Sequence, residues 1–325
     1  SRGLGDVYKR QMNDYKDLMN NEKHYVTFNN YLRYKYHEKV ARISLNAGFT
    51  CPNRDGNKGV GGCIYCSNNL SGDFAGDKNK TFEEQFSSIE KVIQKKWDAD
   101  SFIAYLQAGS NTYADINTLK NVYNSLLTLN ENIKVISIAT RPDCINEEIV
   151  QLLSCINKQK EVWIELGLQS IHATTQKYLN LCYTTADFEK ACNMLIAAKI
   201  KVIVHLINGL PSETEEMMIE NAKYLAKFSL FGVKIHMLHI MKNTTLGEIY
   251  QKKPFALLTL ADFVRITATM LRYLPTSIVI HRLTGDAPKD ELIEPIWTLK
   301  KFVVLNEIDK YMRKNNIYQG DLCIK

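Results

Sequence analysis

Seven short apolar runs, most of them followed by a segment with helical periodicity, limit what this chain can fold into. The runs are nearly continuous in apolar residues, as expected for strands buried on both faces. They lie at residues 40–45, 102–107, 135–140, 162–168, 202–207, 233–240 and 277–283. Helical spacing predicts helices at residues 83–96, 116–129, 147–156, 186–198 and 213–228. The alternation predicts an α/β fold with a parallel sheet, either closed toward a barrel or open and doubly wound.

The first eleven residues, SRGLGDVYKRQ, stand apart from this pattern. Their last six match the translation of a transposon end used to prepare sequencing libraries. We therefore interpret residues 1–11 as a non-native scar and expect the native chain to start at Met12. The rest divides into an N-terminal segment at residues 12–39, a (βα)6 core at residues 40–245 and a C-terminal extension at residues 246–325 that packs on the core. The extension includes a predicted helix at residues 297–315, whose basic face contacts either solvent or RNA.

The bulk properties narrow the class of protein. A formal net charge of +6 permits a nucleic-acid partner but does not require one. No run approaches the roughly 18–20 apolar residues of a membrane span, and no signal-peptide pattern is present. The eight cysteines favour a reducing compartment, where clustered cysteines bind metals or act in redox chemistry. We expect a cytoplasmic protein with no membrane partner and no DNA partner.

Polar side chains collect where the predicted strands end. Because the carboxyl ends of parallel strands meet at one edge of the sheet, these side chains would line a common pocket. Ordinary loop polarity is the alternative explanation. Glu165 can equally be a buried acid paired within a packed barrel, and His205 and His236 can be hydrogen-bonded core histidines. The strand-end residues are Gln107, Gly109, Asn111, Arg141, Glu165, Gln169, His205, His236, His239, His281 and Arg282.

The loop after the first strand, CPNRDGNKGVGGCIYC, carries Cys51, Cys63 and Cys66. A structural zinc site usually needs four Cys or His ligands, and the nearest histidines, His37 and His172, lie far from the loop in sequence. A [4Fe–4S] cluster fits better, because three thiolates leave one iron open for another ligand. The glycines allow the backbone to curl around a compact inorganic body, and their N–H groups can donate to its sulfurs. The loop therefore favours a cluster with an open iron.

Six segments of the chain resemble the YtqA/YhcC family of radical S-adenosylmethionine (SAM) proteins. They are FTCPNRDG, GGCIYC, QAGSNTYA, IATRPDC, IELGLQS and HRLTGDAP. The resemblance runs from about Tyr31 to the C-terminus, and the radical SAM half of the Elongator catalytic subunit shares it more weakly. It implies the radical SAM partial TIM-like barrel, (βα)6 with an added seventh strand and a C-terminal helix. It also implies a [4Fe–4S] cluster and SAM as cofactors.

The resemblance assigns roles to individual residues. Cys51, Cys63 and Cys66 would hold the cluster, and its open iron would chelate SAM. Relatives often carry an N-R-G-H-like stretch after the fourth strand, where this chain has Leu181 in place of the basic residue. Arg141 or Lys234 would have to replace that residue at the SAM carboxylate, and the sequence does not decide between them. The residues expected to contact SAM are Tyr65, Gln107, Gly109, Arg141, Glu165, Gln169 and His205.

A reaction is implied as well. A 5′-deoxyadenosyl radical would abstract hydrogen from the C5 side chain of the wobble uridine in tRNA and take a carboxymethylaminomethyl group toward aminomethyl. An electron donor such as flavodoxin or ferredoxin would reduce the cluster. Tyrosines and cations interleave at residues 31–39, which either contact RNA or cover the barrel rim. The residues expected to contact substrate are Arg54, Asn111, His281, Arg282 and Asp286.

Two other functions stay open on the sequence alone. One is a radical SAM enzyme that acts on a small metabolite, for which the modest net charge suffices. The other is a non-catalytic, metal-bearing RNA-binding protein. No residue is assigned as a general acid or base.

Overall fold

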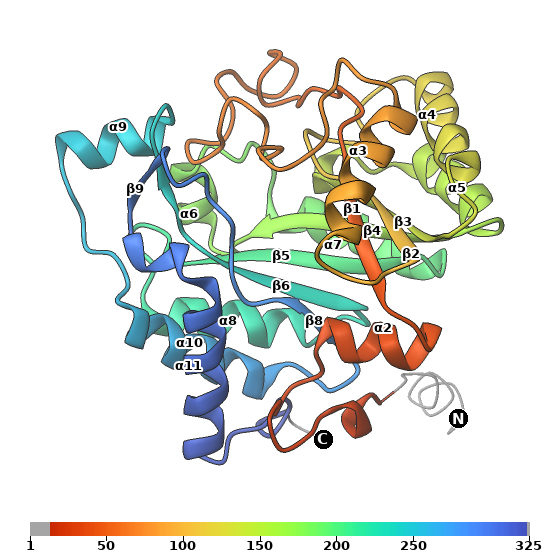
Figure 1. Ribbon diagram of the computed structural model, residues 1–325. Coiled ribbons are helices and arrows are strands. Elements are labelled where there is room, and N and C mark those ends of the chain that lie inside the picture. Colours follow the sequence, from red (N-terminus) through yellow and green to blue (C-terminus); the bar gives the residue numbers. More distant parts are fainter. Residues whose placement is uncertain (1–13, 324–325) are drawn as a thin grey trace, which may run out of the picture.

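The computed structural model describes residues 14–323 (Figure 1). The segment interpreted as a scar, residues 1–11, lies outside the described residues, as does Met12. Seven parallel strands form one curled half-barrel sheet in the order β1-β2-β3-β4-β5-β6-β8. The strands are β1 (Val40–Leu45), β2 (Ser101–Leu106), β3 (Ile133–Thr140), β4 (Glu161–Gln169), β5 (Lys201–Asn208), β6 (Gly232–Met237) and β8 (Val279–Arg282). The predicted α/β fold with a partial barrel and a seventh strand is confirmed.

One strand prediction was too long. The sixth apolar run was expected to form a single strand over residues 233–240, but β6 ends at Met237. Ile240 belongs instead to β7 (Ile240–Met241), which pairs antiparallel with β9 (Leu292–Glu294) in a small separate sheet. An apolar run does not show by itself where the chain turns out of a sheet.

Helices on the outer face of the sheet start where the sequence supplies a capping side chain. Thr81, Asp115, Asn146, Thr184 and Thr214 each accept a hydrogen bond from a backbone N–H in the first turn of the helix that follows. The helices are α3 (Phe82–Gln94), α4 (Ile116–Thr128), α5 (Glu147–Asn157), α7 (Thr185–Ala197) and α8 (Glu215–Leu225). All five predicted helices are present, with ends within a few residues of those expected.

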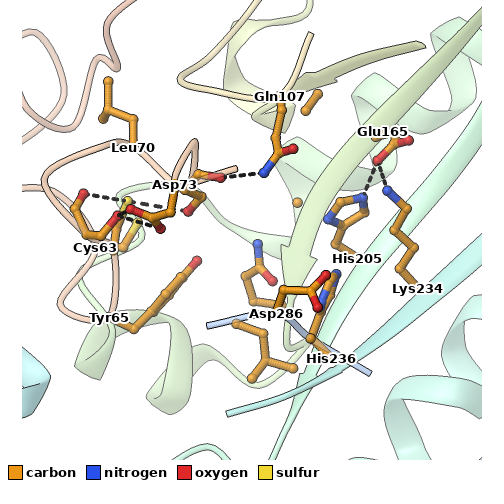
Figure 2. Close-up of a pocket in the computed structure, with 18 of the residues that line it drawn as sticks. Cys63, Tyr65, Leu70, Asp73, Gln107, Glu165, His205, Lys234, His236 and Asp286 are labelled. Carbon is orange, nitrogen blue, oxygen red and sulfur yellow. Dashed lines mark hydrogen bonds and ion pairs between the residues drawn. The ribbon is translucent and has the colours of Figure 1, made fainter. Parts of the chain in front are cut away.

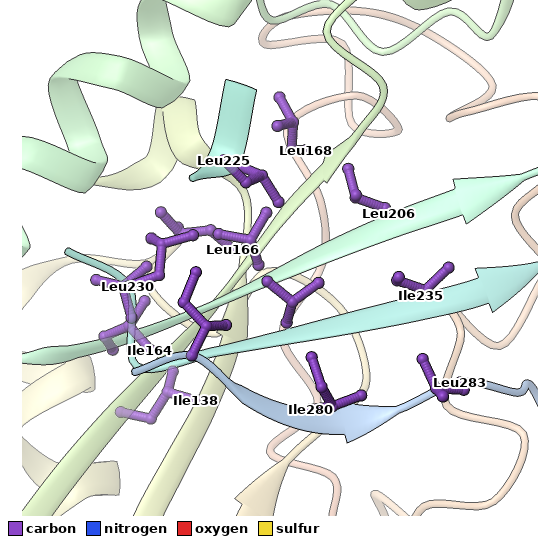
Figure 3. Close-up of a cluster of buried hydrophobic side chains, with 14 of the residues drawn as sticks. Ile138, Ile164, Leu166, Leu168, Leu206, Leu225, Leu230, Ile235, Ile280 and Leu283 are labelled. Atoms are coloured by element: carbon purple, nitrogen blue, oxygen red, sulfur yellow. The ribbon is translucent and has the colours of Figure 1, made fainter. Parts of the chain in front are cut away.

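The main hydrophobic core lies between the sheet and these helices. Side chains alternate along a strand, so every second residue faces the helices. Figure 3 shows this set, in which Leu166 of β4, Leu206 of β5 and Ile235 of β6 pack with Leu225 of α8. The alternate residues face the interior of the half-barrel and are available to build a site.

A second apolar cluster fills the amino-terminal end of the half-barrel. Helix α2 (Phe28–Tyr36) packs there against Trp163 and Phe231. Lys201 Nζ donates to the Tyr31 hydroxyl at 2.7 Å, and Tyr31 is 2 % exposed. Thus the segment at residues 31–39 covers the end of the barrel opposite the strand carboxyl ends, although Tyr34 is exposed.

The remaining elements flank the core. Helix α10 (Leu260–Tyr273) packs against α8 and α11 (Lys301–Lys314), which is the predicted C-terminal helix (Figure 1). Helix α10 was not predicted. The shorter elements are α6 (Ala173–Tyr178), α9 (Thr245–Lys252) and three 3-10 helices, η1 (Lys16–Leu18), η2 (Pro142–Cys144) and η3 (Ile296–Leu299). Within residues 14–323, no helix combines the length and apolar character needed to cross a membrane.

Candidate active site

A cavity of about 420 Å³ opens inside the half-barrel at the carboxyl ends of the strands. Its volume lies in the range of ~300–1,000 Å³ typical of small-molecule sites. Figure 2 shows Cys63 and Tyr65 on one side of the cavity and Glu165, His205 and Lys234 on the other. We call these sides the thiol end (Cys51, Cys63, Tyr65 and Cys66) and the charged end (Arg42, Glu165, His205, Lys234 and Arg282).

The thiol end is built by the long loop between β1 and α3. Asn53 is fully buried, and its Nδ2 donates to the backbone oxygen of Asn180 at 2.5 Å and to the Cys63 sulfur at 3.6 Å. The backbone N–H of Ile64 donates to the Leu179 oxygen at 3.1 Å. These bonds hold the cysteine-bearing part of the loop down on the segment that follows β4.

Arg54 lies within this loop and not on the cavity wall. Its guanidinium donates to the backbone oxygens of Cys66 at 3.1 Å and Ser67 at 2.6 Å. Gly62 allows the close approach, because a Cβ there would lie 2.8 Å from Arg54 Nε, and its φ of +81° also favours glycine. Arg54 therefore sets the shape of the loop, whereas the sequence had suggested a substrate contact.

The thiols of Cys51, Cys63 and Cys66 share one end of the cavity. All eight cysteines of the chain are free thiols. Burial raises the pKa of Cys63 to about 12 and also raises the pKa of Cys66, so these thiols ionise near neutral pH only when a metal binds them. Within residues 14–323, no three His, Cys, Asp or Glu side chains are placed to share a single metal ion. A [4Fe–4S] cluster takes each thiolate on a different iron, and the donor set fits it.

Arg141 lies at the end of β3, beside the thiol end. It pairs with both carboxylate oxygens of Asp143 at 2.9 Å and donates to the Leu181 backbone oxygen at 2.8 Å. Its guanidinium lies 4.8 Å from the centre of the Tyr183 ring. Arg141 is close enough to Cys63 to counteract the rise in its pKa that burial causes. The guanidinium therefore combines a fixed orientation with a place on the cavity wall.

Gln107, Gly109 and Gln169 also line the cavity. Gln107 donates to the backbone oxygen of Ser71 at 2.8 Å, which fixes its side chain. A Cβ at Gly109 would meet the Phe49 oxygen at 2.3 Å, so only glycine allows the backbone to approach the cysteine loop here. Gln169 has a φ of +65° and follows a register shift in the β4–β5 pairing, which turns it toward the cavity.

The charged end centres on Glu165 of β4, whose side chain is completely buried. Its Oε1 accepts a hydrogen bond from Ser137 at 2.9 Å, and its Oε2 accepts one from His205 Nε2 at 2.7 Å and forms an ion pair with Lys234 (Figure 2). The Arg42 guanidinium of β1 lies 3.8 Å from Glu165 Oε1. Side chains from several strands thus converge on one carboxylate.

These contacts decide which groups carry charge. Burial alone would raise the pKa of Glu165, but Lys234, Arg42 and His205 outweigh it and hold that pKa well below its usual range. Burial and neighbouring Lys234 lower the pKa of His205 to about 4. Burial and Arg42 lower the pKa of Lys234 to about 7, although Glu165 opposes this shift. The carboxylate is therefore ionised and the imidazole neutral at pH 7.

The structure brings most of the predicted site residues together around this one cavity. Arg54, Asn111 and His281 are not among its lining residues. Asn111 is fully buried and donates to the Leu106 and Ala139 backbone oxygens at 3.2 and 2.9 Å, and the His281 ring stacks on Phe28 at 4.2 Å. The predicted residues that line the cavity are Cys51, Cys63, Tyr65, Cys66, Gln107, Gly109, Arg141, Glu165, Gln169, His205, Arg282 and Asp286.

Sequence reasoning missed the partners of Glu165. Arg42 and Lys234 both line the cavity, but they stand inside runs whose pattern predicts only apolar strands. The sequence suggested Lys234 only as a replacement for the basic residue that is absent at Leu181. Tyr105 belongs to the same group, since its ring lies 4.9 Å from Arg42 and 4.8 Å from Lys234. A lone cation in an apolar strand was the signal, because a buried charge needs a partner.

Comparison with known proteins agrees with this geometry. Residues 50–225 match the radical SAM superfamily, and residues 231–314 match the radical SAM C-terminal domain. YtqA of Bacillus subtilis is 39% identical over 301 residues, which cover 93% of each chain. YhcC of Escherichia coli is 29% identical over 285 residues, covering 87% of this chain and 90% of that protein.

More distant relatives share part of the chain. The tRNA uridine(34) acetyltransferase of Methanocaldococcus jannaschii is 25% identical over 207 residues, which cover 62% of this chain and 37% of that protein. The solved structure of archaeal Elp3 from Methanocaldococcus infernus, with an N-terminal deletion, superposes with a TM-score of 0.64 at 18% identity, covering 86% of this chain and 64% of that one. That likeness concerns the fold.

The chain belongs to the radical SAM superfamily of enzymes and, within it, to the family of YtqA and YhcC. The superfamily uses a [4Fe–4S] cluster and SAM, and these are the cofactors of this protein. The family resemblance drawn from the sequence is thereby confirmed.

Proposed function

We propose that this protein is a tRNA-modifying radical SAM enzyme that takes the carboxymethylaminomethyl group on C5 of the wobble uridine toward aminomethyl. The observation that carries the proposal is that one cavity has three thiols at one end and a charged group around the buried Glu165 at the other. The similarity to a tRNA uridine(34) acetyltransferase, whose name places its action at the wobble position, supports the choice of substrate.

The thiol end supplies the cofactor site in this proposal. Cys51, Cys63 and Cys66 hold the [4Fe–4S] cluster, and with SAM bound the pair supplies a 5′-deoxyadenosyl radical for hydrogen abstraction. Tyr65, Gln107, Gly109 and Gln169 line the space beside the thiols and contact SAM.

Arg141 binds the SAM carboxylate in place of the basic residue that is missing at Leu181. Arg141 lies beside Cys63, and its planar guanidinium suits a carboxylate. Lys234 was the other candidate, but its side chain is 2 % exposed and lies at the opposite end of the cavity (Figure 2). Arg141 also donates to the backbone oxygen of Leu181, so it lies next to the position where relatives carry the basic residue.

The proposal includes a cytoplasmic location and a flavodoxin or ferredoxin as electron donor. Eight free thiols support a reducing compartment. Two of them, Cys155 and Cys182, are exposed and could form disulfides in an oxidising compartment.

Nucleoside analysis of tRNA from a strain that lacks the gene tests the substrate. We expect the carboxymethylaminomethyl nucleoside to accumulate and the aminomethyl nucleoside to disappear. Restoring the gene should reverse the change, whereas restoring the Cys63→Ala variant should not. An unchanged wobble-uridine profile would remove tRNA as the substrate and leave a small metabolite for a protein that still cleaves SAM.

The cofactor is tested separately on the purified protein. Anaerobic reconstitution should give the absorbance of an iron–sulfur cluster and should allow SAM to be cleaved. A protein that takes up one zinc ion and shows no cluster absorbance would instead be a non-catalytic, metal-bearing protein.

A further inference from the structure

Arg42 has more hydrogen-bonding capacity than its surroundings use. A guanidinium carries five N–H donors, yet within residues 14–323 the Arg42 side chain makes no hydrogen bond, and its Nε is buried without a partner. Its nearest carboxylate oxygen, on Glu165, lies 3.8 Å away, beyond hydrogen-bond distance. The guanidinium lies over the Tyr105 ring at 4.9 Å and lines the cavity. Arg42 is therefore paired with Glu165 only at long range, and its N–H donors remain available to an anion that enters the cavity.

The neighbouring acids leave the Arg42 donors without a hydrogen-bonded partner. Glu165 is already paired with Lys234 and accepts hydrogen bonds from His205 and Ser137. Asp286, the other acid at this end, is shared between Arg282 and Lys301. Three cations of the cavity wall, Arg42, Lys234 and Arg282, therefore face the two carboxylates of Glu165 and Asp286. With Lys234 protonated, one positive charge is in surplus there.

The histidines of the cavity do not change this balance. Burial holds the pKa values of His205 and His239 near 4 and that of His236 well below its usual range. All three are neutral at pH 7 and neither add to nor cancel the surplus. The charged end is therefore a preformed site for one negative charge.

We propose that Arg42, supported by Lys234 and Arg282, binds a carboxylate of the substrate. The proposal rests on the function proposed above, in which the uridine side chain ends in a carboxymethyl group. A guanidinium binds a carboxylate through two parallel hydrogen bonds, and a flat aromatic ring beneath it fixes the plane of the pair. The carboxylate held at the charged end places the adjacent methylene toward the thiol end, across the cavity (Figure 2).

Two other anions are less well suited to this position. The SAM carboxylate has Arg141, which lies near Cys63 at the thiol end of the cavity. A backbone phosphate of the tRNA lies outside the base and its side chain, whereas Arg42 is deep enough for its Nε to be fully covered. The substrate carboxylate, the SAM carboxylate and a tRNA phosphate each predict a different change in binding for an Arg42 variant.

The test is equilibrium binding of two anticodon stem–loop RNAs to the full-length, cluster-loaded protein in the presence of a SAM analogue that cannot be cleaved. The RNAs differ only in their wobble uridine, which carries either carboxymethylaminomethyl or aminomethyl. We expect the wild-type protein to bind the carboxymethylated RNA more tightly by roughly tenfold to a hundredfold, the effect of a hydrogen bond to a charged group. Arg42→Gln should bind both RNAs with the same affinity.

A matched variant controls for the general loss of a positive charge. Arg33→Gln makes the same change on the exposed side of α2 and should keep the full preference. Arg42→Lys keeps the charge without the planar fork, and we expect an intermediate preference. It also serves as the test if Arg42→Gln does not fold, as judged by thermal unfolding.

Three results would overturn the proposal. A wild-type protein without any preference, or an Arg42→Gln variant that retains it, excludes a carboxylate contact. If Arg42→Gln weakened the binding of both RNAs equally, Arg42 would be assigned to a phosphate of the RNA backbone. If Arg42→Gln weakened the binding of SAM and left the binding of both RNAs unchanged, Arg42 would be assigned to the SAM carboxylate. A protein that prefers the carboxymethylated RNA but does not convert it would instead contradict the proposed function and leave the carboxylate site standing.

Discussion

The two ends of the cavity are built in different ways. The thiol end comes from one continuous loop, in which Cys51, Cys63 and Cys66 are close in sequence and are held by backbone hydrogen bonds. The charged end comes from neighbouring and distant strands, because Arg42 stands on β1, Glu165 on β4 and Lys234 on β6. A loop on a finished core can change without unfolding the core, whereas a charge inside the sheet is part of the packing. Substitutions at the two ends should therefore separate chemistry from stability.

The largest expected effect is on the thiol end. Cys63→Ala should abolish SAM cleavage and leave the fold intact, because the loop rests on a core that does not depend on it. Cleavage is measured as 5′-deoxyadenosine formed after anaerobic reconstitution, and folding by circular dichroism. Cys155→Ala is the matched control, since that cysteine is exposed on α5. Global unfolding of Cys63→Ala would show that the loop supports the core.

The next effect is on stability at the charged end. Glu165→Leu leaves Lys234 buried without its anion, and we expect the free energy of unfolding to fall by about 3–5 kcal/mol. The double variant Glu165→Leu/Lys234→Met should recover most of this loss, because an apolar pair replaces the ionic one. Denaturant unfolding measures both.

An exposed ion pair supplies the control for the buried one. Glu307 and Lys310 lie 3.6 Å apart on the surface of α11, and Glu307→Ala should cost about 1 kcal/mol or less. If Glu165→Leu lowered the free energy of unfolding no more than Glu307→Ala does, the charged end would be unimportant for packing. The contrast between the two ends would then fail.

A smaller effect separates the two cations proposed for different ligands. Arg141→Gln should weaken SAM binding by roughly tenfold to a hundredfold, because one charged hydrogen-bonding group is removed. Lys234→Met should leave SAM binding unchanged, since Lys234 lies at the other end of the cavity. Calorimetry on the cluster-loaded protein measures both affinities. The opposite outcome would place the SAM carboxylate at the charged end. In that outcome, SAM binding is weaker in Lys234→Met and unchanged in Arg141→Gln.

The smallest effect is a pH dependence. Burial and Arg42 lower the pKa of Lys234 to about 7, so Lys234 carries its positive charge below pH 7 and loses it above. Binding of the carboxymethylated RNA should therefore weaken as the pH rises from 6 to 8, by up to roughly fivefold, as for a partly screened ion pair. The titratable and charged groups that face Lys234 are Arg42, Tyr105, Glu165, His205, His236, His281 and Arg282.

Lys234→Met tests that assignment. Burial raises the pKa of Tyr105 well above its usual value. The pKa values of Glu165, His205, His236 and His281 are lowered below this range, so none of these groups titrates between pH 6 and 8. The affinity of Lys234→Met for the carboxymethylated RNA should stay constant from pH 6 to pH 8. An unaltered pH profile in Lys234→Met would mean that another group titrates.

Local patterns predicted the elements of this fold well. Strands and helices depend on periodic spacing and on capping residues such as Thr81 and Asp115, which act within a few residues of themselves. The same is true of the cysteine loop, where three thiols and several glycines stand close together in sequence. The functional class of the protein was therefore accessible from the sequence alone.

Positions set by tertiary contact were harder to predict. Arg54 and Asn111 are polar and close to the cysteines or a strand end, yet both donate to backbone oxygens within the protein. His281 follows a strand-like run and packs instead on Phe28 of α2, a helix that the sequence left unassigned. Spacing along the chain does not show whether a polar side chain meets the cavity or a nearby carbonyl.

The sequence by itself determined the order of strands and helices, the three-cysteine loop and the edge of the sheet at which a site would form. Only the tertiary structure decided the curl of the sheet and the meeting of Arg42, Glu165 and Lys234 on its inner face. The physical reason is that periodicity is a property of neighbouring residues. The partner of a buried charge comes from a strand far away in the chain, and only the completed half-barrel brings the two together.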